Sequence, residues 1–345
     1  TNNMAYTTIN KSTDHFNTVT YSGTGSAQSI TGVGFQPDWL WIKHREDVSN
    51  HKLQDVVRGS TKVLGSNENS AEATVAQGVT SFDSDGFSLG TDASVNGTGA
   101  AGIVAWNWKA GGTGSANSDG DIASTVSANT TAGFSIVKWT ANGSNADTVG
   151  HGLGAAPKIV LYKNIDQTGS WYWVYTYVDD SLDYLHINNN NTKADLTLGT
   201  YGFTTSTTIT NLGFGNTHEI LAYCFAEKKG YSRFGSYRGN GDANGTFIYT
   251  GFKPAFVIFK PVAVSGGHWY LYDNKRDTSN VRSVRLYPNL TNAEGDSSDN
   301  NLDFLSNGFK MRSTNNDSNQ NGEEYIYMAF GQSLVGSNNI PCTAG

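Results

Sequence analysis

The sequence predicts an all-β protein made of three tandem antiparallel β-sandwich repeats, similar to jelly rolls. Three observations predict this fold class. The 345 residues include 40 glycines and 12% aromatic but only 15% charged residues, a composition that suits short strands better than helices. Apolar segments recur between turn residues at spacings of roughly 8–12 residues. One sequence plan also occurs three times along the chain.

The repeated plan is clearest around Pro37, Pro157 and Pro254. Each proline precedes an apolar run that ends in a lysine, and the three runs are GFQPDWLWIK, GAAPKIVLYK and GFKPAFVIFK. We expect each proline to set the start of a buried strand.

Each unit closes on an alternating apolar segment, in order GIVAWNWKA, EILAYCFAE and YIYMAFGQS. Alternation of this kind is typical of a strand. We expect the aromatic residues Trp106, Tyr223 and Tyr327 of these segments to be largely buried.

The repeat divides the chain into sandwich units at 1–112, 131–229 and 230–345, the last with a C-terminal tail. Residues 113–130, rich in Gly, Ser and Thr, are expected to be a linker. The second junction, AEKKGYSRFG, is short, so the second and third units are expected to pack directly together. Units of about 100 residues can each own a core, unlike solenoid repeats.

The stretch SFDSDGFSLG (81–90) places Asp83 and Asp85 on either side of a serine. Such a pair could bind calcium, act as paired catalytic carboxylates, or belong to a tight turn. The matching segments, LGTYGFTTST and FLSNGFKMRS, keep the Gly-Phe pair but lose the aspartates. We therefore expect a turn, followed by a phenylalanine that enters the core: Phe87, Phe203 and Phe309.

The sequence offers no catalytic site, metal site or cofactor motif. Its seven histidines show no metal-ligand spacing, and no nucleophile elbow or helix-linked phosphate loop occurs. The two cysteines predict no disulfide framework, and Cys224 lies in an apolar run, where we expect it to be buried and inert. Adjacent carboxylates, at 179–180 and 323–324, would point to opposite faces of a strand.

The motif Asp-x-x-Arg occurs at Asp55–Arg58 and again at Asp273–Arg276. The spacing predicts a local ion pair that fixes a loop, with a structural role.

The best candidate for ligand binding is WYWVYTYVDD, in which Trp171, Trp173 and Tyr175 share one face of a strand. An exposed aromatic face of this kind would stack on sugars. The alternative, which the similar bulk of WYLYD in the third unit favours, is that the face belongs to the core. Candidate polar partners lie in two Asn-rich loops, NNNN (188–191) and TNNDSNQN (314–321). Their candidate residues are Asn189, Asn190, Asn316 and Asp317.

The net charge of −7 and the scattered Lys and Arg residues argue against nucleic acid as a partner. No apolar run approaches the length that spans a membrane as a helix. The chain starts at Thr1 without a signal-like stretch, so we expect it to be a fragment or a trimmed product.

Several longer segments together resemble the repeat domain of tail-fibre-like and other virion structural proteins of marine phages, notably those of cyanobacteria and Pelagibacter-like hosts. They are GFQPDWLWIKHRED, STVSANTTAGFSIVKWTANGSNADTVGHGLGAAPKIV, YCFAEKKGYSRFGSYRGNG, FVIFKPVAVSGGHWYLYDNKRD, LDFLSNGFKMR and YIYMAFGQSLVG. The resemblance covers nearly the whole chain. One departure is AFGQS near the end, where relatives tend to have an acidic residue after Ala-Phe.

The resemblance implies a virion structural protein, a tail fibre or spike that recognises a host cell-surface glycan or receptor and contacts other virion proteins. It also implies a homo-oligomer, and fibres are commonly trimers, although no coiled-coil heptad is present to assemble one. Two alternatives remain open: a capsid or tail spacer that binds no ligand, and, less favoured, a polysaccharide depolymerase with carboxylates drawn from two units.

Overall fold

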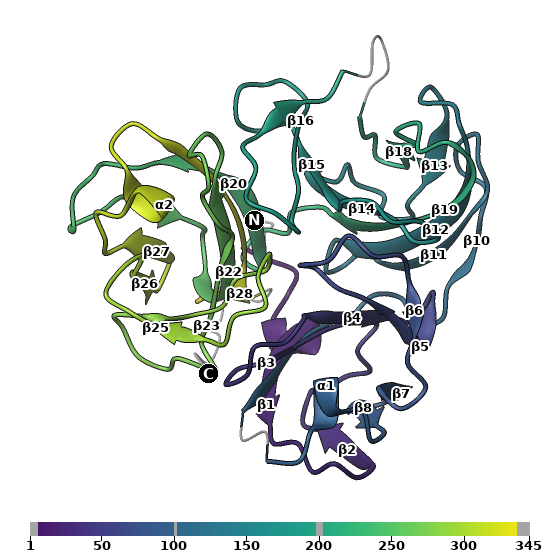
Figure 1. Ribbon diagram of the computed structural model, residues 1–345. Coiled ribbons are helices and arrows are strands. Elements are labelled where there is room, and N and C mark those ends of the chain that lie inside the picture. The colour runs from purple at the N-terminus through teal and green to yellow at the C-terminus, as the bar shows by residue number, and fades with distance from the viewer. Residues whose placement is uncertain (1–5, 100–101, 198–202, 337–345) are drawn as a thin grey trace, which may run out of the picture.

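The chain is almost entirely β-structure in a computed structural model that describes residues 6–99, 102–197 and 203–336, which confirms the predicted all-β class. The antiparallel sheets group into three lobes around a common centre (Figure 1). We call residues 16–108 lobe 1, residues 115–225 lobe 2 and residues 232–332 lobe 3. Helices within the described ranges are short: η1 (Ser12–Asp14), α1 (Ala93–Asn96) and α2 (Asn316–Asn319).

Lobe 1 is a sandwich of a large and a small sheet. The large sheet runs, in spatial order, β1 (Phe16–Tyr21), β9 (Ile103–Trp108), β3 (Trp39–His44), β4 (Lys52–Asp55), β5 (Gly59–Leu64) and β6 (Ala73–Thr74). The small sheet runs β2 (Gln28–Thr31), β8 (Gly86–Leu89) and β7 (Val79–Asp83).

Lobe 2 repeats this order with two extra strands at one edge. Its large sheet runs β10 (Ser115–Asn117), β11 (Ser124–Asn129), β12 (Phe134–Asn142), β19 (Asn216–Phe225), β14 (Ile159–Asn164), β15 (Tyr172–Tyr175), β16 (Asp183–Leu185) and β17 (Ala194–Asp195), and its small sheet β13 (Thr148–Gly150) and β18 (Thr208–Thr210). The expected linker is therefore wrong in part, because β11 pairs with β12 along its whole length and buries Val126.

Lobe 3 has the shortest large sheet, β20 (Ser232–Arg238), β28 (Glu324–Gln332), β22 (Lys253–Pro261) and β23 (Tyr270–Asp273). Its small sheet runs β21 (Phe247–Tyr249), β27 (Gly308–Met311) and β26 (Leu302–Leu305). A further pair is formed by β24 (Val284–Arg285) and β25 (Gly295–Asp296). Strand β21 pairs only with β27, so it forms an edge of the small sheet.

Each lobe has its own core between its large and small sheets. Phe87, Phe203 and Phe309 lie in these cores, as expected from the sequence. Pro37 and its two counterparts are buried at the start of β3, β14 and β22. Tyr327 is buried as expected, but pairing places it level with Ala105 and Ala222, so it faces the core of lobe 3.

A fourth core lies where the three large sheets meet, so the three lobes share one hydrophobic core in addition to the core of each lobe. In β3, Trp39 and Trp41 face this central core while Leu40 and Ile42 face the core of lobe 1. The same alternation occurs in β14 and β22. The large sheets are therefore buried on both faces, which explains their continuous apolar runs.

Ring N–H groups link the lobes in a cycle around the centre. His51 Nε2 lies 2.9 Å from the Tyr287 carbonyl oxygen, and Trp171 Nε1 donates to Gly65 O at 2.8 Å. Trp269 Nε1 donates to His186 O at 2.9 Å. These rings occupy the same position before β4, β15 and β23, so each lobe contacts the next through one equivalent bond.

The predicted local ion pairs are confirmed, and both also join lobes. Arg58 Nε and Arg276 Nε each donate to the aspartate three residues earlier at 2.6 Å. Tyr223 of lobe 2 donates to Asp55 Oδ2 at 2.8 Å, and Trp106 of lobe 1 donates to Asp273 at 3.0 Å. Lobe 2 has the apolar or neutral residues Tyr175 and Val178 at the matching positions.

The lysines that end the three proline-led runs are fully buried and bind loop carbonyl oxygens. Lys43 donates to Asp47 O at 3.1 Å, Lys163 to Gly169 O at 2.6 Å and Lys260 to Gly267 O at 2.7 Å. Burial lowers the pKa of each amine to about 8. These lysines therefore stabilise loops at the ends of the central strands.

The segment at Asp83 and Asp85 is a tight turn between β7 and β8, as expected. Asp85 accepts from Gly34 N at 2.7 Å and Gly32 N at 3.1 Å, and Asp83 accepts from two serine hydroxyls. The following glycine is required by close approach: a Cβ on Gly86 would lie 1.9 Å from Ile30 O. The equivalent Gly308 has the same constraint, whereas Gly202 lies outside the described residues.

Candidate functional site

The aromatic face proposed for sugar binding is not exposed. Trp171, Trp173 and Tyr175 are 0%, 2% and 0% exposed and belong to the central core. Trp173 packs against Trp269 of lobe 3 with ring centroids 4.8 Å apart. The exposed-ladder prediction is wrong because the face that would have met a ligand instead meets the other two lobes.

The two Asn-rich loops converge on one turn of lobe 3. Asn190 Nδ2 donates to Gly266 O at 3.4 Å, and Asp317 lies close to Gly267. Asp317 is half-buried and accepts from the Tyr270 hydroxyl at 2.6 Å. Asn189 accepts from Asn191 N within its own loop, and Asn316 is exposed at the start of α2. The first loop thus contacts lobe 3 from lobe 2, whereas the contacts of the second loop lie within lobe 3. Among the four candidate residues Asn316 is the exposed one.

A polar pocket of about 250 Å³ lies beside the second of these loops. Its lining comes from Ala243, Ser298, Asp299, Arg312, Ser313, Thr314 and Asn315. Asn316 directly follows the lining residue Asn315, so the predicted loop does border a hollow in the surface. Strand β21 starts four residues after Ala243, at the same end of the small sheet.

Strand β21 carries the most exposed aromatic residues of the described chain. Phe247 is 43% and Tyr249 is 59% exposed, while Ile248 between them points into the core of lobe 3. The two exposed rings share one face and lie about 7 Å apart along the strand. Lys310 is paired with Phe247 across the sheet, so its side chain shares this outer face.

Tyr6 extends this aromatic surface beyond the end of β21. Its hydroxyl donates to Gly251 O at 2.9 Å, and Lys229 Nζ lies 4.4 Å from its ring centroid. Burial and a hydrogen bond with Tyr249 raise the pKa of Tyr6 to about 12. We call Tyr6, Phe247 and Tyr249 the β21 surface.

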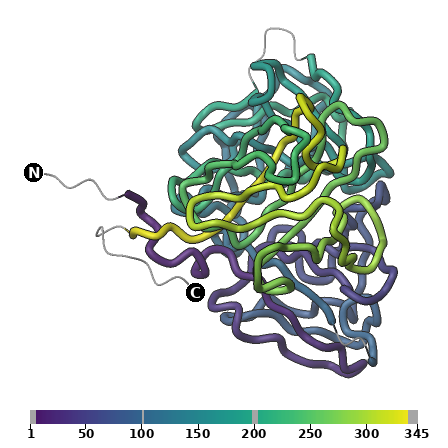
Figure 2. The backbone as a smooth tube through the Cα atoms, turned by 90° about the vertical axis from the view of Figure 1, so that its left-hand side faces the viewer, coloured from purple at the N-terminus to yellow at the C-terminus, as the bar shows by residue number. Residues whose placement is uncertain are grey.

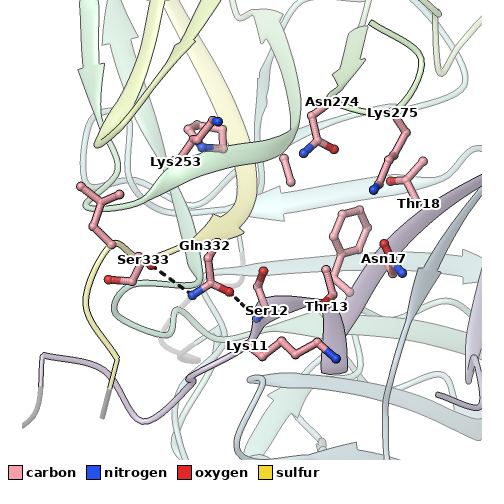
Figure 3. A pocket seen from close by; sticks show the side chains of 14 residues that line it. Lys11, Ser12, Thr13, Asn17, Thr18, Lys253, Asn274, Lys275, Gln332 and Ser333 are labelled. Atoms are coloured by element: carbon pink, nitrogen blue, oxygen red, sulfur yellow. Dashed lines mark hydrogen bonds between the residues drawn. The ribbon is translucent and has the colours of Figure 1, made fainter. Parts of the chain in front are cut away.

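A second pocket, of about 210 Å³, lies where lobe 1 meets lobe 3 (Figure 3). It is bounded by residues 11–13 and 16–18, by the start of β22, by the turn after β23 and by the end of β28. Gln332 forms part of its wall, where it accepts from Ser12 N at 2.6 Å and donates to Ser333 O at 3.1 Å. The first and last described segments of the chain lie on the same side of the molecule (Figure 2), and both contribute residues to the lining of this pocket.

The β21 surface could have been found by comparing the repeats position by position. Strand pairing places Phe247 and Tyr249 level with Ser29 and Thr31 of lobe 1. Two outward polar positions have therefore become aromatic in lobe 3. The segment FIY has only two aromatic residues, whereas WYWVYTY has five, so the sequence pattern alone did not select it.

Among the residues that the structure describes, no three His, Cys, Asp or Glu side chains are placed to hold a metal ion. The 210 Å³ pocket is lined by no carboxylate, and the 250 Å³ pocket by Asp299 alone. No helix of the described ranges is long and apolar enough to cross a membrane.

The fold and these sites define a closed, three-lobed, all-β protein with surface pockets around its third lobe. The chain belongs to the family described as DUF7483, a domain of unknown function, whose profile matches residues 11–333. Neither the curated proteins nor the solved structures include a significant match to it.

Proposed function

We propose that this chain is a carbohydrate-binding domain of a virion structural protein, a tail fibre or spike, and that the β21 surface contacts a host cell-surface glycan. The observation that carries the proposal is the exposure of Phe247 and Tyr249 on one face of β21. Single exposed apolar residues are common, but neighbouring exposed rings that form a contiguous patch often mark a binding site.

The chemistry of the β21 surface suits a sugar chain. Aromatic faces stack on the apolar faces of sugar rings, and the hydroxyl of Tyr249 adds a polar group at the rim. The 250 Å³ pocket near the start of β21 supplies hydroxyl, amide and guanidinium groups, which suit sugar hydroxyls. A rigid scaffold with polar groups beside aromatic rings is the arrangement expected of a binding module.

The virion context rests on the segments that resemble phage fibre proteins. In that context the glycan would be on the host surface, the remaining partners would be other virion proteins, and the chain would be a homo-oligomer. We propose a binding role and no catalytic one, since a depolymerase would need two carboxylates about 5–10 Å apart in a groove.

The proposal is tested by incubating the purified chain with intact cells of several candidate hosts and with their extracted surface polysaccharide. The assay measures retention of the chain and newly released reducing ends. The diagnostic variant is Phe247→Ser with Tyr249→Thr, which gives lobe 3 the residues of lobe 1. Its matched control is Ser29→Ala with Thr31→Ala, at the equivalent positions of lobe 1.

Retention that polysaccharide competes away, and that only the β21 variant loses, would support the proposal. Release of reducing ends would replace it with a depolymerase. Absence of both across all hosts would favour the spacer role.

A further inference from the structure

The pocket between lobes 1 and 3 has a charge opposite to that of the chain. The chain carries a net charge of −7, yet this pocket is lined by Lys11, Lys253 and Lys275 and by no carboxylate. Lys11 is paired with Asp14 at 2.8 Å. Within the described residues, Lys253 and Lys275 make no ion pair, so two positive charges face the pocket without a partner.

The same seam between lobes is closed at the two equivalent places. Strand pairing puts Thr18 level with Ile136 and Phe234, both of which are buried in the central core. Lys275 stands two residues after Asp273, where lobes 1 and 2 have Val57 and Tyr177, which pack against that core. An apolar pair has thus been replaced by a hydroxyl and an amine only where the pocket opens.

Thr18 lacks the partner that a buried hydroxyl normally has. The residue is 4% exposed and lines the pocket, and its Oγ1 makes no hydrogen bond to any described residue. A buried polar group without a partner destabilises the fold, so its presence in an otherwise apolar row calls for a compensating contact. In Figure 3 Thr18 and Lys275 lie at the same end of the pocket.

Other polar groups of the pocket divide into those that are engaged and those that are free to bind. Asn17 donates to Val33 O at 3.0 Å, and the Gln332 amide is occupied at both ends. The Asn274 side chain makes no hydrogen bond to a described residue, so it can donate to a ligand beside Lys275. At about 30 Å³ per water, the pocket has room for an oxyanion with its nearest waters.

We propose that this pocket binds a small oxyanion, a sulfate, phosphate or carboxylate group, held by Lys253 and Lys275 with help from Asn274 and Thr18. Ammonium groups, hydroxyls and amides are the donors that such oxygens accept from. The site shares no residue with the β21 surface, so it goes beyond the proposed glycan site and can fail or succeed separately.

The first experiment titrates inorganic sulfate, phosphate and acetate into the full chain by calorimetry at constant ionic strength. Saturable binding of at least one anion is expected, and Lys253→Gln and Lys275→Gln should each weaken it about tenfold, the loss of roughly one charge-assisted bond. The double variant Thr18→Ile with Lys275→Val, which installs the residues of the seam between lobes 1 and 2, should abolish binding and leave the melting temperature unchanged or higher. Lys52→Gln, a lysine outside the pocket, is the charge-matched control.

Two outcomes would overturn the proposal: no saturable binding of any of the three anions, or an equal loss in Lys52→Gln, which would reveal a non-specific charge effect. A second arm compares galactose 6-sulfate with inorganic sulfate. Tighter binding of the sulfated sugar would support the site and assign its oxyanion to a saccharide, while equal affinity would support the site and assign it to a free ion.

Discussion

At the scale of single residues, the centre of the molecule depends on a few buried polar contacts between lobes. The Asp55–Arg58 pair is completed by the Tyr223 hydroxyl, and Asp273–Arg276 by the Trp106 indole. Buried charges need all their partners, because an incompletely bonded carboxylate costs more than a single hydrogen bond contributes. These contacts therefore fix how the lobes are placed around the central core.

Tyr223→Phe removes the hydroxyl that reaches Asp55 from lobe 2. We expect a loss of about 1.5–3 kcal/mol in the free energy of unfolding, the range for a hydrogen bond to a charged group. Denaturant unfolding measures this loss. Tyr184→Phe is the control, because the Tyr184 hydroxyl makes no hydrogen bond to a described residue, and it should change stability by less than about 0.5 kcal/mol. Equal effects in both variants would contradict the assignment.

His51 predicts how stability depends on acid pH. It accepts from Trp41 Nε1 at 2.8 Å through Nδ1, so the neutral ring donates through Nε2 to Tyr287 O. Burial, with the nearby Lys43 charge, lowers its pKa from 6.5 to about 3. The unfolded chain then binds the proton first as the pH falls, so stability is full above pH 6.5 and is lost below it, by up to about 5 kcal/mol near pH 3.

The measurement is the free energy of unfolding between pH 7 and pH 3.5 for the wild type and His51→Gln. The variant, which has no ring to protonate, should show a shallower decline. Parallel curves for wild type and His51→Gln would show that His51 does not control the acid limb.

At the scale of strands, the sequence predicted the positions of strands and turns well, but it did not predict how the sheets pack against one another. The prolines, the Gly-Phe turns and the buried Phe87 and Phe309 followed from the repeat. The burial of Trp171 and Trp173 did not follow from the repeat, because alternation shows which residues share a face of a strand but not what covers that face. A usable signal was present: runs such as WLWIK are apolar on both faces, which is typical of strands buried on both sides.

The turn glycines give a test at this scale. Gly86→Ala would place a Cβ 1.9 Å from Ile30 O, so the β2–β8 pairing must shift. We expect a cost of about 1–3 kcal/mol in the free energy of unfolding, typical of overpacking. At Gly295 a Cβ would meet nothing within 4 Å, so Gly295→Ala is the control and should be nearly neutral. An unchanged free energy of unfolding in Gly86→Ala would contradict this account, because it would show that the β2–β8 pairing accommodates the added Cβ without cost.

At the scale of the whole molecule, the shared core makes the three lobes one folding unit. Residues from all three large sheets form a single cluster, which includes Trp39, Tyr223 and Phe330. A lobe alone would expose the aromatic rows that now face the centre, and burial of such surface is the main source of stability. The repeat therefore describes the order of strands within each lobe and does not define independent domains.

Calorimetry should accordingly show one unfolding transition for the full chain, with equal calorimetric and van't Hoff enthalpies. Lobe 2 prepared alone, as the fragment 115–225, should lack a cooperative transition. Three separate transitions, or a fragment as stable as the full chain, would contradict a shared core.

The functional account depends on one surface of this unit, the exposed face of β21. The most direct test is the dissociation constant for the host polysaccharide, measured with the wild type and with the variant Phe247→Ser/Tyr249→Thr. The account predicts at least about tenfold weaker binding by the variant, since each lost ring contributes roughly 1 kcal/mol or more, with unchanged melting temperature and an unaffected Ser29→Ala/Thr31→Ala control. Equal affinity of the wild type and the β21 variant would contradict it.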